Sequence, residues 1–585
     1  MSAIISGEMM KKELFDEICK AENFSDYCNS YSPFLSSIGL QVSEDINGVG
    51  DYYLHYNRVT RRIYKNAISF DKPMNIALSN ISKIVFGDGE ASLSFYKNDA
   101  FIFESTLEKI RLFAENGEKT IEMPVVESGE KIFFSGYSEN FDERDPDKYV
   151  PYKCGVKIIR GKYDNHVITA ENGLIRFAVV FAVLDIDDET LNDVLEICPD
   201  SIEKAEFLGD TLLKGMLMDF DFDFQEKDYP LIAKSVRGLI FNTAICPGKL
   251  KNHLTSFPNR GGYPTQFVWD TFFHNLAFEE IDVNTAKQFL LQMIENQRCD
   301  GKYPQFICST WDRPTEAQPA LAGSMAKRII KKINDREFEQ TVLDSLIKNN
   351  IWWLTQRMTK YGVIYSVSGF ETGQDNSPRF DNGPTLAVDM NGYLLEQIRY
   401  TSQLAHKLSI HECAAHWKEQ ADLLEKNMIK HLYDEERNMF FDVDLNTGEK
   451  IKIVSPSSFI PLWADISIDF EKKKDMIEKY LVNEEYLFSK YPFPSVAYNE
   501  GCYSSHDWWR GPVWISMAYF MLEILKENGY NEEYTEAVKR LYKMISDDAK
   551  MSELFDSQSG KGLGFSPQGW TCAVFIRLCM ILSEI

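Results

Sequence analysis

The chain has 585 residues, of which 44% are hydrophobic, and it carries a formal net charge of −25. This length exceeds that of one ordinary hydrophobic core and predicts more than one domain. The negative charge argues against nucleic acid and against an anionic membrane surface as partners, because both need a basic protein surface, whereas a neutral small molecule fits.

The N-terminus and the cysteines predict a cytoplasmic location. The first residues lack a basic start followed by a long apolar stretch, so they do not resemble a signal peptide. No apolar run reaches the roughly 18 residues of a transmembrane helix. Eleven cysteines occur without a CxxC pair, and an odd number cannot all pair within one chain, so reduced thiols are expected. The sequence carries no signal for an oligomeric state.

Residues 1–185 are predicted to form an antiparallel β-sandwich domain. From about residue 30 onward, short runs alternate apolar and polar residues, as in 91–98, 99–105 and 174–184. Turn pairs such as Asn116-Gly117 and Asn172-Gly173 separate them. Period-two alternation with frequent turns is typical of a sandwich of antiparallel strands.

Helical periodicity begins near residue 186. The acidic segment 186–224 is predicted to be a helical linker, and residues 225–585 repeatedly place apolar residues at three- and four-residue spacing. Paired helices of this number form either a solenoid or a closed toroid. The lack of a fixed repeat and the long loops rich in Trp, Pro and Gly favour a toroid with a site on one face. Residues 439–453 are predicted to form an inserted β-hairpin with its turn at 446–448.

Residues suited to chemistry gather in the loops of the helical part. The segments are 263–274, 300–306, 310–321, 369–384, 506–514 and 551–571. Cleaving a glycosidic bond requires two carboxyl groups, one that protonates the leaving oxygen and one that activates water or attacks the sugar. These loops therefore have to supply a pair of such groups.

Two carboxyl groups stand out, each with a simpler alternative. Asp375 lies in the turn Gly373–Arg379, where Arg379 can orient a carboxylate or a sugar hydroxyl. The alternative is an Asp-Asn-Ser-Pro turn that caps the next helix. Glu553 follows a helix and precedes a Gly-rich stretch, and by itself such a residue is more often a solvated helix end than a catalytic group.

The segment 506–514 holds three tryptophans and Arg510 within nine residues. Tryptophan faces stack on sugar rings, and arginine binds hydroxyls or carboxylates. The alternative is a hydrophobic plug that starts the following helix, with Pro512 in its first turn. Both interpretations can hold for different tryptophans.

No metal or phosphate site is predicted. The glycines at 560, 562 and 564 lack the Lys-Ser/Thr ending of a phosphate loop. Asp442 and Asp444 imitate the start of a calcium loop, but Gly448 comes one place late and no suitably spaced Glu follows, so a hairpin turn is expected. The nine histidines form no HExxH or other zinc-like cluster.

Taken in order, the loop segments resemble glycoside hydrolase family 63 and its relatives, including trehalases and the bacterial mannosylglycerate and glucosylglycerate hydrolases. The resemblance covers about 225–585. It rests on Trp269-Asp270, Gln318-Pro319, Gly373–Arg379, Trp509–Trp514 and the stretch from Glu553 to Thr571. Any one piece is weak, whereas all of them in this order are specific.

The resemblance implies an N-terminal β-sandwich at 1–185 and an (α/α)6 barrel at 225–585. It implies an inverting glycosidase that cleaves an α-linked glycoside, a small carbohydrate substrate, without a metal or cofactor. Asp375 matches the general acid, Glu553 matches the general base, and Asp270 matches a residue that holds sugar hydroxyls. The other positions expected at the substrate are Tyr263, Phe267, Trp269, Gln318, Trp508, Trp509, Arg510 and Trp514. Phe267 and Trp508 stand where Trp and Tyr are frequent, which leaves the identity of the sugar open.

Inversion sets two further expectations. The two carboxyl groups should lie roughly 6.5–9.5 Å apart, so that a water fits on the far face of the sugar. Asp375 should be protonated at the working pH, which burial or a neighbouring carboxylate such as Glu371 or Asp381 would favour.

Two other functions compete with this hypothesis. Helical toroids also host sugar epimerases and lyases that use His or Tyr bases, and His274 and His506 both fall near the loops described above. A non-catalytic sugar-binding protein is the third hypothesis, and it predicts binding without release of reducing sugar.

Overall fold

The structure is a computed structural model of the chain. It describes residues 13–18, 30–31, 38–44, 50–56, 64–65, 68–70, 76–79, 83–86, 89–97, 100–112, 125–128, 130–139, 149–182, 188–217, 220, 222–246, 248–250, 252–260, 262–263, 265–308 and 315–585. The predicted turn at Asn116-Gly117 and residues 310–314 of the third loop lie outside these ranges.

The chain divides into two compact units. The first comprises Met1–Asp223, Val236–Thr265 and Cys308–Trp311, and the second comprises Phe224–Ser235, Gln266–Ile307 and Asp312–Ile585. Helix α4 (Tyr229–Phe241) therefore begins in the second unit and ends in the first. No helix in the described part of the chain is long and apolar enough to span a membrane.

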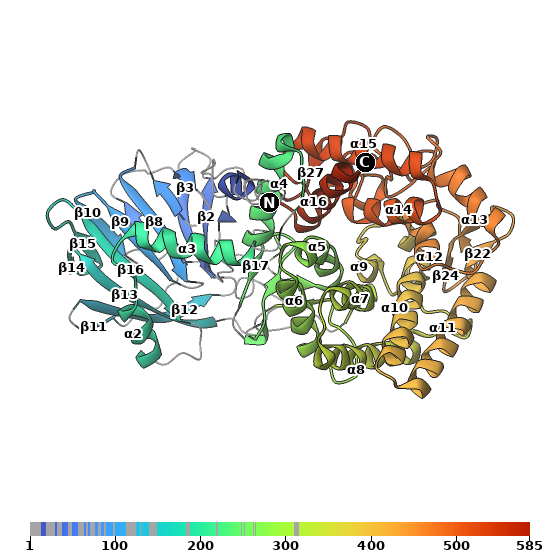
Figure 1. Cartoon of the computed structure of the whole chain (residues 1–585), viewed down its shortest axis with the longest axis horizontal. Coiled ribbons are helices and arrows are strands. Elements are labelled where there is room, and N and C mark those ends of the chain that lie inside the picture. Colours follow the sequence, from blue (N-terminus) through green and yellow to red (C-terminus); the bar gives the residue numbers. More distant parts are fainter. Residues whose placement is uncertain are drawn as a thin grey trace, which may run out of the picture. The chain divides into compact units, whose positions relative to one another are not determined.

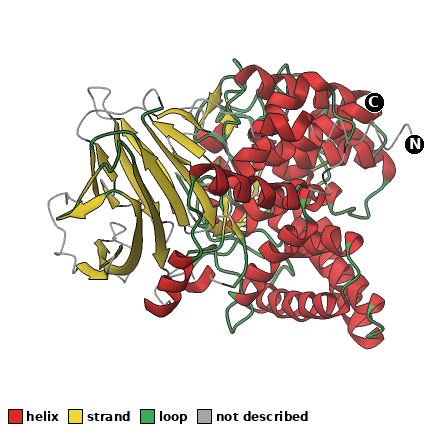
Figure 2. Cartoon of the chain, turned by 60° about the vertical axis from the view of Figure 1, so that its left-hand side comes forward, coloured by secondary structure: helices red, strands yellow, loops and turns green. Residues whose placement is uncertain are grey.

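Antiparallel sheets make up most of the first unit (Figure 2). The largest has the strand order β11-β12-β13-β16-β9-β8-β7-β6, and two four-stranded sheets have the orders β14-β15-β10-β5 and β1-β2-β3-β4. The strands of the largest sheet are β6 (Ile76–Ser79), β7 (Lys83–Phe86), β8 (Ala91–Lys97), β9 (Ala100–Ser105), β11 (Val125–Ser128), β12 (Lys131–Glu139), β13 (Tyr149–Arg160) and β16 (Ile175–Ala182). The others are β1 (Ser30–Tyr31), β2 (Ile38–Glu44), β3 (Gly50–Tyr56), β4 (Tyr64–Lys65), β5 (Ile68–Phe70), β10 (Lys109–Leu112), β14 (Lys162–Asp164) and β15 (Val167–Thr169).

The alternation of apolar and polar residues in the sequence corresponds to an alternation of buried and more exposed side chains in these strands. Every second residue of β7 and β10 is buried, so one face of each strand packs inward. The predicted turn at Asn172-Gly173 is present, with positive φ at both residues and a bridge between Glu171 and Leu174 on either side. These observations confirm the antiparallel β region.

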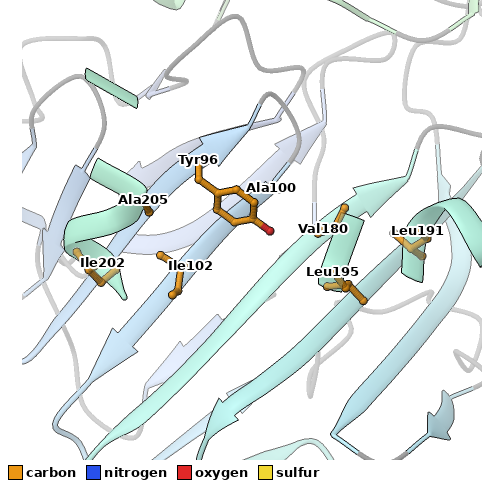
Figure 3. Packing of buried hydrophobic residues seen from close by; sticks show 8 residues of the cluster. All are labelled: Tyr96, Ala100, Ile102, Val180, Leu191, Leu195, Ile202 and Ala205. Carbon is orange, nitrogen blue, oxygen red and sulfur yellow. The ribbon is translucent and has the colours of Figure 1, made fainter. Parts of the chain in front are cut away.

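The sequence predicts that the segment 186–224 is a helical linker. Its helices instead belong to the first unit, which extends to Asp223. Its helices α2 (Asp188–Glu196) and α3 (Ile202–Met216) pack on strands of the large sheet. Figure 3 shows the buried cluster that they share, formed by Tyr96, Ala100, Ile102, Val180, Leu191, Leu195, Ile202 and Ala205. Gly155 in β13 permits this contact, because a Cβ there would lie 2.7 Å from the Leu195 side chain. The apolar spacing of both helices therefore covers the sheet.

Six helices of the second unit form a closed ring of contacts (Figure 1). Each packs against the next in chain order, and the last packs against the first. They are α5 (Val268–Ile281), α7 (Ala322–Lys332), α10 (Val388–Lys407), α12 (Ile460–Trp463), α14 (Ile515–Glu527) and α16 (Gly569–Glu584). The predicted helical region is thus confirmed, and these six helices close into a circuit.

Other helices pack outside this ring. They are α6 (Val283–Glu295) against α5 and α7, α8 (Arg336–Trp352) against α7 and α10, α11 (His411–Leu432) against α10, and α15 (Asn531–Asp548) against α14 and α16. The ring helix α5 is buried along nearly its whole length. By contrast, α11 buries only one stripe, made of Ala414, Trp417, Ala421, Leu424, Met428 and Leu432. A helix that is apolar all round belongs in a core, and an amphipathic one covers it.

The hairpin predicted at 439–453 is present as β24 (Asp442–Asp444) and β25 (Lys450–Ile451). Its acidic residues are used structurally, because the Asp444 carboxylate accepts from the backbone of Asn446 at 2.8 Å and of Thr447 at 3.0 Å. Asp442 is buried against Arg379, with Nη1 at 3.1 Å from both carboxylate oxygens. These two carboxylates therefore stabilise the hairpin turn and the contact with Arg379.

Candidate active site

The loops singled out from the sequence lead into the N-termini of ring helices. Phe267 immediately precedes α5, the segment 315–321 precedes α7, and the segment 369–387 precedes α10. Trp514 immediately precedes α14, and Gln568 precedes α16. Because an outer helix returns the chain between successive ring helices, these N-termini share one end of the ring. The loops that lead into these helices are gathered there.

Asp270 is the group that connects the carboxylates of the site. It lies in the first turn of α5 and is 5% exposed. Burial raises its pKa well above the usual range, and repulsion from Glu553 and then from Asp375 adds to this, while a backbone hydrogen bond opposes it. Asp270 therefore interacts electrostatically with carboxyl groups from two other segments of the chain.

Asp375 occupies a tight turn, as predicted. Gly373 before it has φ of +72°, and a Cβ at that glycine would lie 3.3 Å from the Trp269 ring, so a glycine lets the turn approach α5. Contrary to expectation, Asp375 is exposed. Of the two proposed neighbours, Glu371 pairs with Arg357 at 2.7 Å and Asp381 pairs with Arg510, whereas the carboxyl group that interacts with Asp375 is that of Asp270.

Glu553 is not a solvated helix end. It is 2% exposed and precedes the short strand β26 (Leu554–Phe555), which pairs with β27 (Gly562–Leu563). Its Oε2 accepts from the backbone N–H of Phe565 at 3.0 Å, and its carbonyl accepts from Trp570 Nε1 at 2.9 Å. The returning 562–571 stretch therefore holds both ends of this residue.

A glycine defines the space around that carboxylate. Gly564 has φ of +74°, and a Cβ there would overlap Glu553 Oε2. We expect Gly564→Ala to displace the carboxylate and to lower kcat by roughly 10²-fold, the cost of a misplacement of about 1 Å. The measurement is kcat together with the thermal unfolding midpoint.

Gly529→Ala is the matched control for that substitution. Gly529 has φ of +81° and no neighbouring atom within 4 Å of an added Cβ, so this variant carries the same backbone strain without the overlap. Equal activity losses in the two variants would show that strain, and not displacement of Glu553, lowers the rate.

The pH dependence of stability tests the environment of Asp270. In the unfolded chain an Asp titrates near about 3.9. Since the folded pKa is higher, the folded state holds more protons between the two values, and stability is lost as the pH rises through the folded value. Asp270→Asn removes this loss, so its thermal midpoint should exceed that of the wild type by a margin that grows as the pH rises from the unfolded value through the folded value. A midpoint difference that does not change with pH would contradict the assignment.

Gln318 and Phe267 are placed beside α5. Gln318 Oε1 accepts from the backbone N–H of Trp269 at 2.9 Å, which satisfies one of the otherwise unpaired donors at the start of the helix. Phe267 is half-buried, and its ring lies 5.4 Å from that of Phe306 across the strand pair β19 (Gln266–Phe267) and β20 (Phe306–Ile307). Their predicted contact with substrate stays a prediction.

The tryptophans of 506–514 divide into two kinds. The rings of Trp509 and Trp514 stack at 3.7 Å and 5°, and these side chains are 2% and 1% exposed, so they form the hydrophobic plug. Trp508 is half-buried, with φ of +40°. Its carbonyl accepts from Trp514 Nε1 at 2.9 Å. A tryptophan held in the left-handed region is strained, and such strain persists where surrounding contacts enforce it.

Tyr263 belongs to the first unit, where it is half-buried and its backbone N–H donates to the carbonyl of Asn259 at 2.6 Å. Its predicted role at the substrate stays a prediction. Arg379, suggested as an orienting group, is 1% exposed and binds Asp389 and Asp442, so it belongs to the core beneath the turn.

Sequence reasoning missed the support under Asp375. The neighbouring Gln374 is buried, and its Nε2 donates to Asp389 Oδ2 at 3.0 Å and to Ser457 Oγ at 2.8 Å. Nothing in the pattern around Ser457 indicates this contact, because it depends on how two ring segments meet. Among the described residues, no group of three or more His, Cys, Asp or Glu is arranged to hold a metal ion.

The two histidines of the epimerase or lyase hypothesis are not placed alike. His274 lies in the buried helix α5, where an added Cβ at Gly569 would overlap its ring, and burial lowers its pKa to about 3. His506 is exposed, and its Nδ1 lies 3.4 Å from Ser505 Oγ. A base that titrates so low takes a proton poorly near neutral pH, so His274 does not support that hypothesis.

Comparison with known proteins matches this part of the chain. The profile of the family described as "Mannosylglycerate hydrolase MGH1-like glycoside hydrolase domain" matches residues 263–571, just over half of the chain. A mannosylglycerate hydrolase of Thermus thermophilus is 22% identical over 397 residues, which cover 54% of this chain and 94% of that enzyme.

Two solved structures from the same species are similar. They are the GH63 mannosylglycerate hydrolase of Thermus thermophilus in complex with glucose, at a TM-score of 0.53 and 22% identity, and with Tris and D-glycerate, at 0.54 and 20%. The first match covers 60% of this chain and 99% of that chain, and the second 59% and 99%. The rest of this chain thus has no counterpart in those structures.

The helical unit, with its carboxylates borne on loops at the N-termini of ring helices, is a glycoside hydrolase domain. The chain belongs to the MGH1-like glycoside hydrolase family and is a glycosidase. The hypothesis of a non-catalytic binding protein is not favoured by this membership.

Proposed function

We propose that the protein is an inverting glycosidase that uses Asp375 as general acid and Glu553 as general base. The observation that carries the proposal is the electrostatic coupling of buried Asp270 to both groups, which brings three carboxyl groups from separate segments of the chain into one site. Asp375 protonates the leaving oxygen, and Glu553 takes a proton from the attacking water. Asp270, on the rigid first turn of α5, binds sugar hydroxyls between them.

The two carboxyl groups stand in different environments. Asp375 is exposed in a turn, where it can reach a leaving oxygen and exchange its proton with solvent. Glu553 is buried, and the backbone N–H bonded to its Oε2 favours the charged form that a general base requires, against the opposing effect of burial. The assignment of acid and base therefore rests on the motif positions of the two residues and not on their burial.

The closed circuit of helices supports a further assignment of the fold. We propose that α5, α7, α10, α12, α14 and α16 are the inner layer of an (α/α)6 barrel and that the sheets of the first unit form a β-sandwich. In such a barrel the inner N-termini open to one face, so the substrate enters there.

The substrate proposed is a small α-linked glycoside. The related Thermus thermophilus enzyme is a mannosylglycerate hydrolase, and its structures hold glucose in one case and D-glycerate in another. A glucoside or mannoside of a small acceptor fits this relationship. The half-buried Trp508 offers one aromatic face at the site, on which a sugar ring can stack.

Two measurements test the proposal. A panel of α-glucosides, α-mannosides and glycosylglycerates, assayed for released reducing sugar, identifies a substrate. Proton NMR of the first product formed from that substrate should show the β-anomer, the result of inversion. Appearance of the α-anomer first would make Glu553 a nucleophile and overturn the mechanism, and no release from any member would overturn the substrate class.

A further inference from the structure

The side chain of Asn376 joins two loops of the candidate site. Its Oδ1 accepts from the backbone N–H of Trp509 at 2.8 Å, and its Nδ2 donates to Asp507 Oδ1 at 3.1 Å. Asn376 follows Asp375 directly in the chain, whereas Asp507 and Trp509 flank Trp508. One amide therefore connects the turn that bears the proposed acid with the loop that bears the half-buried tryptophan.

Asn376 is not used as a local cap, although its sequence context predicts one. The short helix that follows (Pro378–Phe380) is preceded by Ser377, and no side chain caps it. Both of these hydrogen bonds of the Asn376 amide reach residues more than a hundred positions away in the chain. The polar atoms of the Asn376 side chain therefore fix the relative position of the two loops.

The same loop shows why such a connection is needed. Trp508 has φ of +40°, a conformation that is strained for a residue other than glycine. The bond from Trp509 to Asn376 fixes the peptide that follows, and Trp514 Nε1 holds the Trp508 carbonyl. A second connection, from Arg510 to Asp381, ties the far side of the loop to the residues after the turn.

We infer that Asn376 is a positioning residue that sets the direction of the Asp375 carboxyl relative to the loop of Trp508, and so controls proton delivery to the leaving group. This inference rests on the proposed role of Asp375. Asp375 itself is exposed at the tip of its turn, so its direction depends on how firmly the turn is held. The side chains of both neighbouring residues, Asn376 and Gln374, hold this turn through hydrogen bonds to other segments.

A change of leaving group separates positioning of the acid from a general structural role. Asn376→Ala should lower kcat ten- to a hundredfold on a glycoside with an alcohol leaving group, since a misplacement of about 1 Å costs roughly 10². On the corresponding glycosyl fluoride, whose leaving group departs without protonation, the same variant should lose less than about threefold. The thermal midpoint should change little, because only two hydrogen bonds are lost.

An exchange of donor and acceptor provides the rescue. Asn376→Asp alone brings two carboxylates together and should lose activity on the glycoside at least as strongly as Asn376→Ala. In the double variant N376D/D507N, the new carboxylate accepts from Trp509 and from the new amide at 507, and the net charge equals that of the wild type. Its kcat should return to within about threefold of the wild-type value. Asn528→Ala, at the C-terminal end of α14, is the control for the loss of a hydrogen bond from an asparagine side chain. This variant should hydrolyse both substrates at the wild-type rate.

Three results would overturn the inference: unchanged kcat in Asn376→Ala, equal losses on glycoside and fluoride, or a double variant no better than Asn376→Asp. The proposed function has its own test in Asp375→Asn. If Asp375→Asn is inactive while the Asn376 variants fail these expectations, only the positioning role is wrong. Full activity of Asp375→Asn would instead remove the proposed acid itself.

Discussion

Replacing Asp375 with asparagine is expected to lower kcat by about 10⁴-fold on a glycoside whose leaving group needs a proton. The amide has the size of the carboxyl group but cannot donate the proton, so the barrier rises by about 5.4 kcal/mol. Asp375 is exposed and sits in a turn held by neighbouring side chains, so the fold should tolerate the change. The measurement is kcat and KM on the best substrate of the panel, with the thermal midpoint alongside.

The glycosyl fluoride distinguishes an acid from any other role for Asp375. Because fluoride leaves unprotonated, Asp375→Asn should retain most of the wild-type rate on that substrate. Asp547→Asn, an exposed residue paired with Lys543 on α15, is the matched control and should be fully active on both substrates. A loss of equal size on glycoside and fluoride would mean that Asp375 does not act as the acid.

Glu553→Gln should lose activity on both substrates, again by about 10⁴-fold. The glutamine carbonyl can still accept from the Phe565 N–H, so the local structure should persist, but it cannot take a proton from water. The attacking water needs a base whichever group leaves, so the loss of activity should be as large on the fluoride as on the glycoside. The pair of variants therefore gives opposite patterns, one dependent on the leaving group and one independent of it.

Glu536→Gln on α15 is the control for this substitution, since Glu536 is half-exposed and pairs with Arg540 one turn away. If Glu553→Gln hydrolyses the fluoride at the wild-type rate, Glu553 is not the base. Steady accumulation of a covalent glycosyl-enzyme in the wild type would point to a nucleophile in its place.

Much of the fold is local in origin and could be predicted. Strand alternation in β7 and β10 and the Asn172-Gly173 turn follow from short stretches of sequence. The destination of the 186–224 helices could not be predicted, because an amphipathic helix fits a linker and a sheet cover equally well. The distinction depends on contacts with the sheet, such as that of the Leu195 side chain with Gly155, which the local sequence does not contain.

The candidate site also has features that could be predicted from local sequence and features that could not. The loops could be found because Asp, Trp, Gly and Pro gather between helices, and the order of their motifs indicated the acid and the base. Burial could not be predicted: Asp375 is exposed, and the isolated Glu553 is enclosed. Those outcomes depend on which distant segment closes over each group, such as the 562–571 stretch over Glu553.

The contact of α16 with α5 has a consequence for how the protein is made. The ribosome synthesises α5 first among the ring helices, and α16 only after the other five. Until α16 emerges, one side of the buried helix α5 lacks its partner, and the apolar surface of the growing ring stays open to solvent. Long-range closure of this kind folds slowly and exposes aggregation-prone surface meanwhile. Nascent chains should therefore need chaperone protection until α16 has emerged, and variants that lack α16 should be insoluble.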